Sequence, residues 1–501
     1  MRRVSLILMA VAMTAGGARL AEAQGYRVRL DSRVQSVAYR GVVPDSIPAD
    51  EAVIGENGGF ETPDGFAVRC RPGFAYCSYY RPGPEQRGGP MVSTADVRMW
   101  GLGIRGLSLH ANTRIGVDVG NTDVWPGTDP AVQLIEGYAE FARPAYRARA
   151  GRMYEATRLG YTGYDGVRGE LRLADRQARF AAYAGRGLAR ALALPVTSPA
   201  LDPLDDFQPL RRQWVFGGTG SWTSEFADVR AVYEREVDPG NDNLVAERVG
   251  LEVVVRAPLD IGFEGGVDYD LAAGWWGSAE LSVSRGFDDW GRLRVGARRY
   301  RPHFELWTIW GAFSPTPYRA AFGIASVMPV AGLDVTLRGE VYEYDDTGAR
   351  TPLVAGEEDG WRWSVTGRYA IRDQWSMHAG LHREKGPGAG AFGYDGGIAY
   401  QAERFQVSAR ASYLERPLEF RFDDAKVWGI GTDAYWTVLP NLALRGGVWR
   451  FDEERRRPDA AQFSWDQFRL HAGVTLTLSS VSSDFGVPPA VMQIPMRGGR
   501  R

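Results

Sequence analysis

The side chains best suited to acid–base chemistry or metal binding in this sequence are its histidines. The chain has five: His110, His303, His378, His382 and His471. His378 and His382 are the closest pair, and on a strand that rises roughly 3.3 Å per residue they share a face at a separation of about 13 Å. One metal ion cannot bind both at that distance, so we interpret them as two polar residues of one strand face.

Motifs of known enzymes are not found in the sequence. It has no G-x-S-x-G nucleophile elbow, no H-E-x-x-H motif, no phosphate-binding P-loop and no C-x-x-C-H haem site. We therefore predict that the chain is not an enzyme and holds no cofactor and no metal. A Ser, His and Asp assembled from separate strands is the alternative that a motif search leaves open.

The two cysteines, Cys70 and Cys77, flank a turn at Pro72-Gly73. In an oxidising compartment such a pair forms a lasting disulfide, and this is our main prediction. Metal binding is the alternative, but no histidine lies nearby and two ligands do not make a zinc site.

Seven arginines and one glutamate stand out because each lies on the polar side of a segment in which apolar and polar residues alternate. They are Arg292, Arg294, Arg338, Glu340, Arg362, Arg368, Arg410 and Arg469. If that side lines a pore, rings of arginine favour anions. The interpretation that we favour is a lumen of mixed charge, in which arginines pair with acids such as Glu340 and Glu252. The near balance of 59 basic and 61 acidic residues supports it.

The alternation itself runs from about residue 96 to residue 478, in segments of roughly 9 to 13 residues separated by short turns rich in Gly, Pro, Asp and Asn. In residues 333–341, Leu333, Val335 and Leu337 oppose Asp334 and Thr336. A period of two places one set of side chains on each face of a sheet. The chain is therefore predicted to be all-β.

Three features favour a membrane barrel over a soluble sandwich. The strands follow one another without comparable helices, and an aliphatic face opposes a face that is often charged, as in a lipid-facing wall around a wet interior. Aromatic residues gather toward strand ends, where the lipid–water interfaces would lie. The tryptophans concerned are Trp275, Trp276, Trp290, Trp307, Trp310, Trp361, Trp363, Trp375, Trp436 and Trp449.

A sheet in a bilayer must close on itself, because unpaired backbone groups cannot face hydrocarbon. We count about 22 candidate strands and predict one large transmembrane antiparallel up-and-down β-barrel of about 18–24 strands. The mean hydropathy of −0.28 argues against a polytopic helical membrane protein.

The N-terminus predicts export. Arg2 and Arg3 precede an apolar stretch over residues 4–13, and Ala21-Glu22-Ala23 forms a cleavage site. The apolar stretch is too short to span a membrane as a helix, which needs about 20 residues. We thus expect a signal peptide at residues 1–23, and localisation in the bacterial outer membrane follows from export and the barrel together.

The rest divides into three regions. Residues 24–95 are expected to hold an N-terminal strand and loop with the cysteine hairpin, and to be a possible plug. Residues 96–480 are expected to form the barrel, and residues 481–501 a tail. Within the barrel, the proline-rich residues 188–212 are expected to be a long loop or a constriction.

One passage resembles a known group of proteins. Gly151-Arg152-Met153, followed by the stretch that begins Gly160-Tyr161 and ends Val167-Arg168, is similar to a strand end, loop and turn found in alginate-export and related porins. The likeness covers about 20 residues and is otherwise architectural. It implies a passive channel and does not identify a solute.

We therefore predict an outer-membrane porin that passes small polar solutes, passively or selectively. Its expected partners are the lipid bilayer, the solutes, the outer-membrane assembly machinery and further copies of the chain in a homo-oligomer. The charge balance gives no reason to expect nucleic-acid binding. Three rivals stay open: a scaffold or receptor that anchors a surface or periplasmic partner, an adhesin acting through its loops, and a barrel enzyme. A TonB-dependent transporter is disfavoured, because only about 70 residues precede the barrel and such a plug is longer.

Overall fold

The structure of the 501-residue chain is a computed structural model, and it describes residues 25–55, 59–119, 132–173, 177–188, 213–240, 244–301, 317–345, 359–372, 374–386, 389–419, 422–454 and 465–480. The predicted signal peptide, the tail at 481–501, residues 189–212 and His303 lie outside these ranges. No helix in the described part of the chain is long and apolar enough to cross a membrane.

The described residues form 26 strands. Their bounds are β1 Gly25–Gln35, β2 Val37–Pro48, β3 Val53–Ile54, β4 Phe60–Glu61, β5 Tyr76–Gly88, β6 Pro90–Trp100, β7 Leu107–Asp118, β8 Val132–Ala142, β9 Tyr146–Thr157, β10 Gly160–Leu173, β11 Ala178–Gly187, β12 Trp214–Thr223, β13 Ala227–Val237, β14 Leu244–Ala257, β15 Ile261–Asp270, β16 Trp275–Phe287, β17 Gly291–Tyr300, β18 Tyr318–Val330, β19 Leu333–Tyr344, β20 Asp359–Ile371, β21 Trp375–Gly386, β22 Ala389–Gln401, β23 Phe405–Glu419, β24 Phe422–Leu439, β25 Leu442–Glu454 and β26 Trp465–Ser479.

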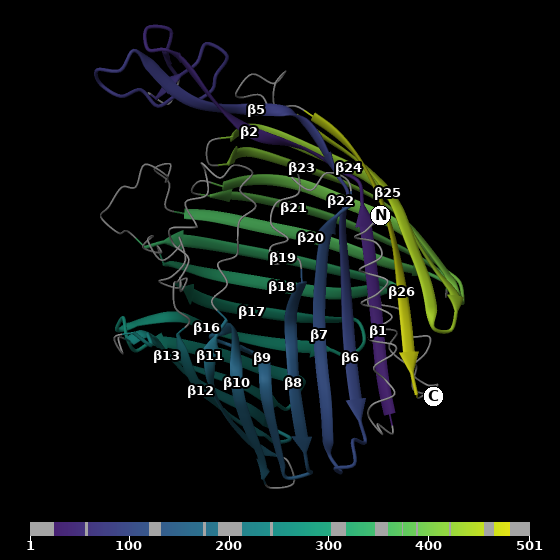
Figure 1. Cartoon of the computed structure of the whole chain (residues 1–501). Coiled ribbons are helices and arrows are strands. Elements are labelled where there is room, and N and C mark those ends of the chain that lie inside the picture. Colours follow the sequence, from purple (N-terminus) through teal and green to yellow (C-terminus); the bar gives the residue numbers. More distant parts are fainter. Residues whose placement is uncertain are drawn as a thin grey trace.

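Twenty-two of these strands make one closed sheet (Figure 1). Each strand from β6 to β26 pairs antiparallel with the next, and β1 closes the ring by pairing with β6 on one side and β26 on the other. The predicted fold, a large antiparallel barrel of 18–24 strands, is confirmed. Closure leaves no unpaired sheet edge, which is the condition for a β-structure to cross a bilayer.

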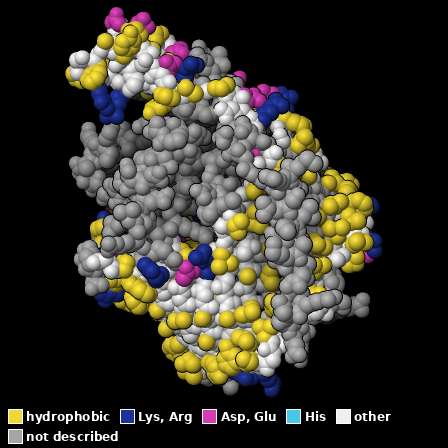
Figure 2. Space-filling view, in the orientation of Figure 1, with side chains coloured by type: hydrophobic (Ala, Val, Ile, Leu, Met, Phe, Trp, Pro, Cys, Tyr) yellow, Lys and Arg dark blue, Asp and Glu magenta, His cyan; other side chains and the backbone are white. Residues whose placement is uncertain are grey.

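Alternation sorts the side chains between the two faces of the wall. On β19, Leu337 and Val341 point outward and are 45% and 60% exposed, while the intervening Glu340 is buried on the inner side. Hydrophobic side chains gather on the lower part of the outer wall (Figure 2). An apolar outer face around a polar interior is typical of an outer-membrane barrel.

The connections at the two ends of the barrel differ in length. At one end none is longer than residues 101–106, whereas at the other they include residues 119–131, 188–213, 301–317, 345–358 and 455–464. Gly332, at φ +83°, lies in the two-residue turn between β18 and β19. Outer-membrane barrels place short turns in the periplasm and long loops outside the cell, so the second end is the outer one.

Most of the N-terminal region lies outside the barrel, but its first strand belongs to it. The N-terminal strand expected within residues 24–95 is β1, a full strand of the barrel, and β6 begins at Pro90, so the barrel sheet includes residues before 96. Between them, β2 and β5 pair with each other and continue the wall beyond the outer end as a two-stranded arm (Figure 1). We call residues 37–88 the arm. It begins at the outer end of β1 and extends away from the barrel, which is not the position of a plug.

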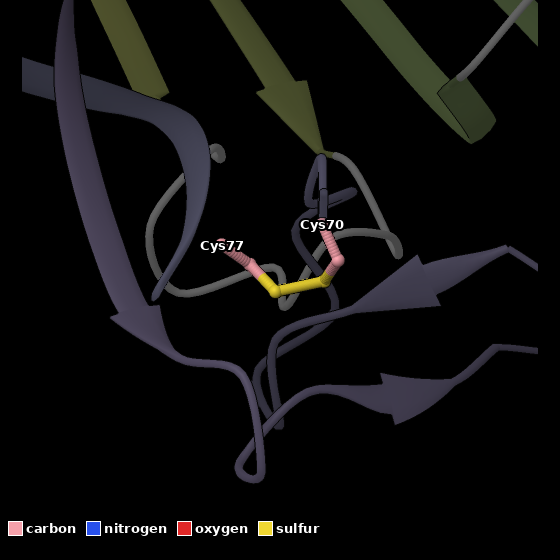
Figure 3. Close-up of a disulfide and its surroundings, with 2 residues drawn as sticks. All are labelled: Cys70 and Cys77. Atoms are coloured by element: carbon pink, nitrogen blue, oxygen red, sulfur yellow. A yellow bond between two sulfur atoms is a disulfide. The ribbon is translucent and has the colours of Figure 1, made fainter. Parts of the chain in front are cut away.

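The tip of the arm carries the short pair β3 and β4 and a disulfide between Cys70 and Cys77 (Figure 3). Cys77 is fully buried, whereas Ile54 and Phe74 are 73% and 63% exposed. The disulfide therefore holds together a small tip that presents apolar side chains to solvent.

A charged pair lies further along the arm. The backbone amide of Ser46 lowers the pKa of Asp45, and the Arg81 guanidinium adds to the effect.

Candidate functional site

The eight predicted pore-lining residues lie on the inner face of the barrel. The strand registers place them on β17, β19, β20, β23 and β26, always on the side opposite the exposed aliphatic residues. Alternation was sufficient for this placement, because in a closed barrel the polar set of each strand can only face the lumen.

Most of these arginines have a carboxylate partner. Arg294 contacts Glu264 at 2.8 Å and Glu280 at 3.1 Å. Arg410 contacts Asp433 at 2.7 Å. Arg338 and Arg362 lie 3.4 and 2.8 Å from Glu340. The lumen has mixed charge, which is the arrangement that the sequence favoured over an open ring of arginines.

Glu340 differs from its predicted role. It also accepts a bond from Arg298 at 2.6 Å, and its side chain is 0% exposed beneath the three guanidinium groups. A solute in the lumen meets those arginines and not the carboxylate. Glu340 therefore holds part of the wall together and does not itself line the pore.

Basic side chains outnumber acidic ones around a hollow of about 370 Å³ on the inner wall at β1 and β23–β26. We call it the basic pocket. Its lining includes Arg33, Arg410, Arg445 and Arg469, with Asp433, His471, Trp449 and Phe451.

Two of the four arginines in the basic pocket are neutralised and two are not. Arg410 pairs with Asp433, and Arg445 pairs with Asp31. Among the described residues, Arg33 and Arg469 have no carboxylate partner. The pocket thus offers two guanidinium groups whose charge is not neutralised, and such groups bind carboxylates and phosphates through paired hydrogen bonds.

Aromatic rings form the back of the basic pocket. Trp449 and Phe451 stack with their planes 10° apart and their centroids 5.6 Å apart. The guanidinium of Arg469 lies 4.9 Å from the Phe451 centroid, and that of Arg410 lies 5.4 Å from the Trp449 centroid. These cation–π contacts hold the arginines over the rings.

Sequence reasoning missed half of this pocket. Arg33 was overlooked because its segment was treated as preceding the barrel. Arg445 lies on the same face as Trp449 and could have been found from the alternation of residues 443–451. Trp449 was assigned to the interfacial aromatics, but its register with Arg469 places it in the lumen.

A second cluster lies on another part of the inner wall. Met153, Tyr164, Tyr183 and Val215 form a buried core on the inner face of β9–β12. The turn between β9 and β10, Arg158-Leu159, reaches across to β14–β16. Together we call these residues the inner wedge. It includes part of the passage that resembled alginate-export porins.

Polar contacts fix the inner wedge. Arg248 donates to the carbonyl of Leu159 at 2.8 Å and contacts Glu234 at 3.2 Å. Glu234, whose side chain is 2% exposed, also accepts bonds from the hydroxyls of Thr162 and Tyr183. A buried charge with this many partners is satisfied, so the wedge is a packed element.

A line of glycines lets the sheet bend inward at the wedge. Gly151 pairs with Gly166, and Gly166 pairs with Gly185 on the next strand. A Cβ at Gly166 would collide with the carbonyl oxygen of Ala184, and one at Gly151, where φ is +138°, would collide with that of Gly137. Only glycine permits strands to approach this closely.

Three of the described histidines, His110, His378 and His471, contact carboxylates. His378 and His382 both lie on the inner face of β21, and His378 is 3.7 Å from Asp395. His110 contacts Asp96 at 2.8 Å. Within the described ranges, no group of three or more His, Cys, Asp or Glu residues could hold a metal ion.

Comparison with known proteins identifies the architecture only. No family model matches the chain. No curated protein sequence matches it. Among solved structures, a mutant of the ferric enterobactin receptor from Pseudomonas aeruginosa in complex with enterobactin aligns with a TM-score of 0.54 at 10% identity, over 91% of this chain and 82% of the receptor.

Two porins align over similar lengths at lower scores. A BenF-like porin from Pseudomonas fluorescens Pf-5 gives a TM-score of 0.40 at 11% identity, covering 90% of this chain and 99% of the porin. The outer membrane protein OpdK of Pseudomonas aeruginosa gives 0.36 at 10% identity, covering 91% and 99%. The closed sheet, its apolar outer wall and the shared fold make this chain a β-barrel of the bacterial outer membrane.

Proposed function

We propose that the chain is a channel for the passive passage of small polar solutes, and that the basic pocket makes it prefer anions. A barrel of 22 strands is too wide for its own side chains to fill. The arm extends away from the lumen, and the inner wedge occupies one side of it. The observation that carries the proposal is the pair of arginines without carboxylate partners among the described residues, Arg33 and Arg469.

Size alone does not favour a porin, because barrels of 22 strands are typical of plugged transporters. The described residues that precede β6 supply a wall strand and the arm, and none of them forms a domain inside the barrel. This supports a channel over a plugged transporter. The narrower likeness to alginate-export porins, the signal peptide, a homo-oligomer and insertion by the outer-membrane assembly machinery stay predictions.

The experiment is single-channel recording of the refolded chain in a planar bilayer, with the reversal potential measured under a salt gradient. We expect discrete openings and a reversal potential that indicates anion preference. Arg469→Gln should move the reversal potential toward cations. Arg450→Gln removes an equal charge from the outer face of β25 and serves as the matched control. A folded barrel that never conducts would contradict the channel, and equal shifts in the two variants would contradict the role of the basic pocket.

The second candidate is a surface receptor or a scaffold for a partner, and the arm favours it. The arm begins at the outer end of the barrel, its tip is clasped by a disulfide, and its exposed residues are unusually apolar for a loop in solvent. A variant that lacks residues 37–88, with β1 joined to β6 by a short turn, distinguishes the channel from the receptor. Unchanged conductance with loss of a cell-surface partner would favour the receptor.

A further inference from the structure

A large hollow lies on the outer wall of the barrel, where a convex apolar surface is expected. It has a volume of about 850 Å³ and crosses β14–β20. Most of its lining alternates with residues of the lumen and belongs to the lipid-facing set: Leu251, Val253, Gly265, Val267, Ala279, Leu281, Ala297 and Ala321 are among its members. We call it the outer groove. Because the wall crosses the bilayer, lipid contacts this groove directly.

The strand registers explain why the wall is hollow here. Ala297 of β17 pairs with Ala321 of β18, so two small side chains form the floor. Leu281 pairs with Ala297 on one side, and Val341 pairs with Ala321 on the other. Leu281 and Val341 are 63% and 60% exposed and form the two walls. The result is an apolar groove whose width is set by large residues on either side of small ones.

Charged side chains lie at one end of the outer groove. Arg299 and Arg319 pair in register at the next outward-facing position toward the outer end of the barrel, with side chains 56% and 66% exposed. Arg299 contacts Asp345 at 2.8 Å, and Arg319 lies 3.7 Å from Glu343. Long arginine side chains at this depth extend toward the head groups of the membrane. The apolar groove and a pair of guanidinium groups are therefore adjacent.

We propose that the outer groove binds one lipopolysaccharide molecule of the outer leaflet. One acyl chain fills the groove, Arg299 and Arg319 bind a phosphate of the lipid, and the neighbouring Glu343 and Asp345 bind the divalent cations that bridge such phosphates. Guanidinium groups recognise phosphate oxygens in pairs, and carboxylates are the ligands that Ca²⁺ and Mg²⁺ prefer. An empty apolar groove in hydrocarbon would forfeit the contacts of its lining.

The shape of the groove favours a lipid over a second copy of the chain. The outer wall of another barrel is broad and carries large residues, so it would meet Leu281 and Val341 and leave the floor uncovered. An acyl chain is narrow and flexible enough to contact Ala297 and Ala321. The position of the charges, at the outer end of the barrel, selects a lipid of the outer leaflet.

The test measures lipid retained by the full chain, purified from outer membranes in mild detergent and analysed by native mass spectrometry. We expect one lipopolysaccharide per folded barrel. Arg299→Gln combined with Arg319→Gln removes the phosphate contacts, and Ala297→Leu combined with Ala321→Leu fills the floor. The arginine pair should reduce retention by roughly 30-fold, since each basic residue near a lipid surface contributes about 1 kcal/mol. The leucine pair should also reduce retention, because the acyl chain loses its contacts with the floor of the groove.

Ala148→Leu is the matched control for the filled groove. Ala148 is an exposed residue of the outer face of β9, far from the groove along the sheet, and it pairs with Gly169, beside which there is open space. The control should retain lipopolysaccharide like the wild type. Retention that is equal in all variants, retention of phospholipid instead, or chain dimers without lipid would each overturn the proposal. Retention does not depend on conductance, so a closed barrel would leave this result intact.

Discussion

Arg158 donates a hydrogen bond to the hydroxyl of Ser278 at 3.0 Å, although 120 residues separate them along the chain. The bond joins the turn after β9 to the inner face of β16. Six strands separate β9 from β16 in the sheet, so this contact joins parts of the wall that are not neighbours. It anchors the inner wedge and reduces the open cross-section of the lumen.

Arg158→Ala should therefore increase single-channel conductance. Without the guanidinium, the turn loses its contacts with Ser278 and Asp268 and becomes mobile within the lumen. Arg172→Ala is the control, because Arg172 also faces the lumen but pairs with Glu170 of its own strand. A rise in conductance that is equal in both variants would be an effect of charge and would contradict the role of the turn.

The Arg248–Glu234 pair should dominate the stability of the inner wedge. Arg248→Met leaves Glu234 as a buried charge without its cation, which costs on the order of 3–5 kcal/mol in unfolding free energy. Adding Glu234→Leu removes that charge as well and should recover part of the loss. Urea unfolding in detergent micelles, followed by tryptophan fluorescence, measures both. A double variant that is less stable than Arg248→Met would contradict this account.

Two glycines of β10 allow a matched test of the inward bend. Gly166→Ala introduces a Cβ against the carbonyl oxygen of Ala184, whereas Gly169→Ala introduces one into open space. We expect Gly166→Ala to lose about 1–3 kcal/mol through overpacking, and Gly169→Ala to lose little. The shift in mobility between heated and unheated samples on gels reports the folded fraction. Equal folded fractions would mean that the bend does not need glycine.

The sequence was sufficient to predict the strands of the barrel wall, but not the contacts between side chains inside the lumen. Alternation assigns Arg338, Arg362 and Arg410 to one face of their strands, because the period of two leaves a strand only two orientations. It cannot reveal that Arg158 reaches Ser278, since that contact depends on how sharply the sheet bends. It also cannot show that Glu340 is covered. The three arginines over it come from β17, from its own strand β19 and from β20, and their meeting follows from register, which alternation leaves undefined.

The arm shows a second limit of prediction from sequence, which concerns amino-acid composition. Its proline- and glycine-rich composition predicted an irregular region or a plug, because such residues are depleted in strands. In the structure, β2 and β5 pair with each other beyond the wall, and Pro44 pairs with Tyr80 in that ladder. A two-stranded ribbon has two free edges, where the missing N–H of proline is tolerated.

The disulfide should stiffen the tip of the arm without affecting the barrel. Replacing Cys70 and Cys77 together by Ser opens a small loop, and loop-closure entropy predicts a local cost of about 2.5 kcal/mol. Limited proteolysis of the refolded chain should then cleave the tip faster, while conductance and heat stability of the barrel stay unchanged. Loss of the folded barrel would show that the arm is needed for closure.

Glu340 should control both stability and selectivity on its side of the lumen. Glu340→Gln keeps the shape of the side chain but leaves Arg298 and Arg338 without a counter-charge, and Arg362 with only Glu384 at 4.0 Å, which we expect to cost about 3 kcal/mol. The same change should move the reversal potential toward anions. Glu343→Gln on the same strand is the control, because its side chain is 55% exposed and such surface pairs contribute at most about 1 kcal/mol. If Glu340→Gln proved no more harmful than Glu343→Gln, the three arginines would have to be held by packing and not by the carboxylate beneath them.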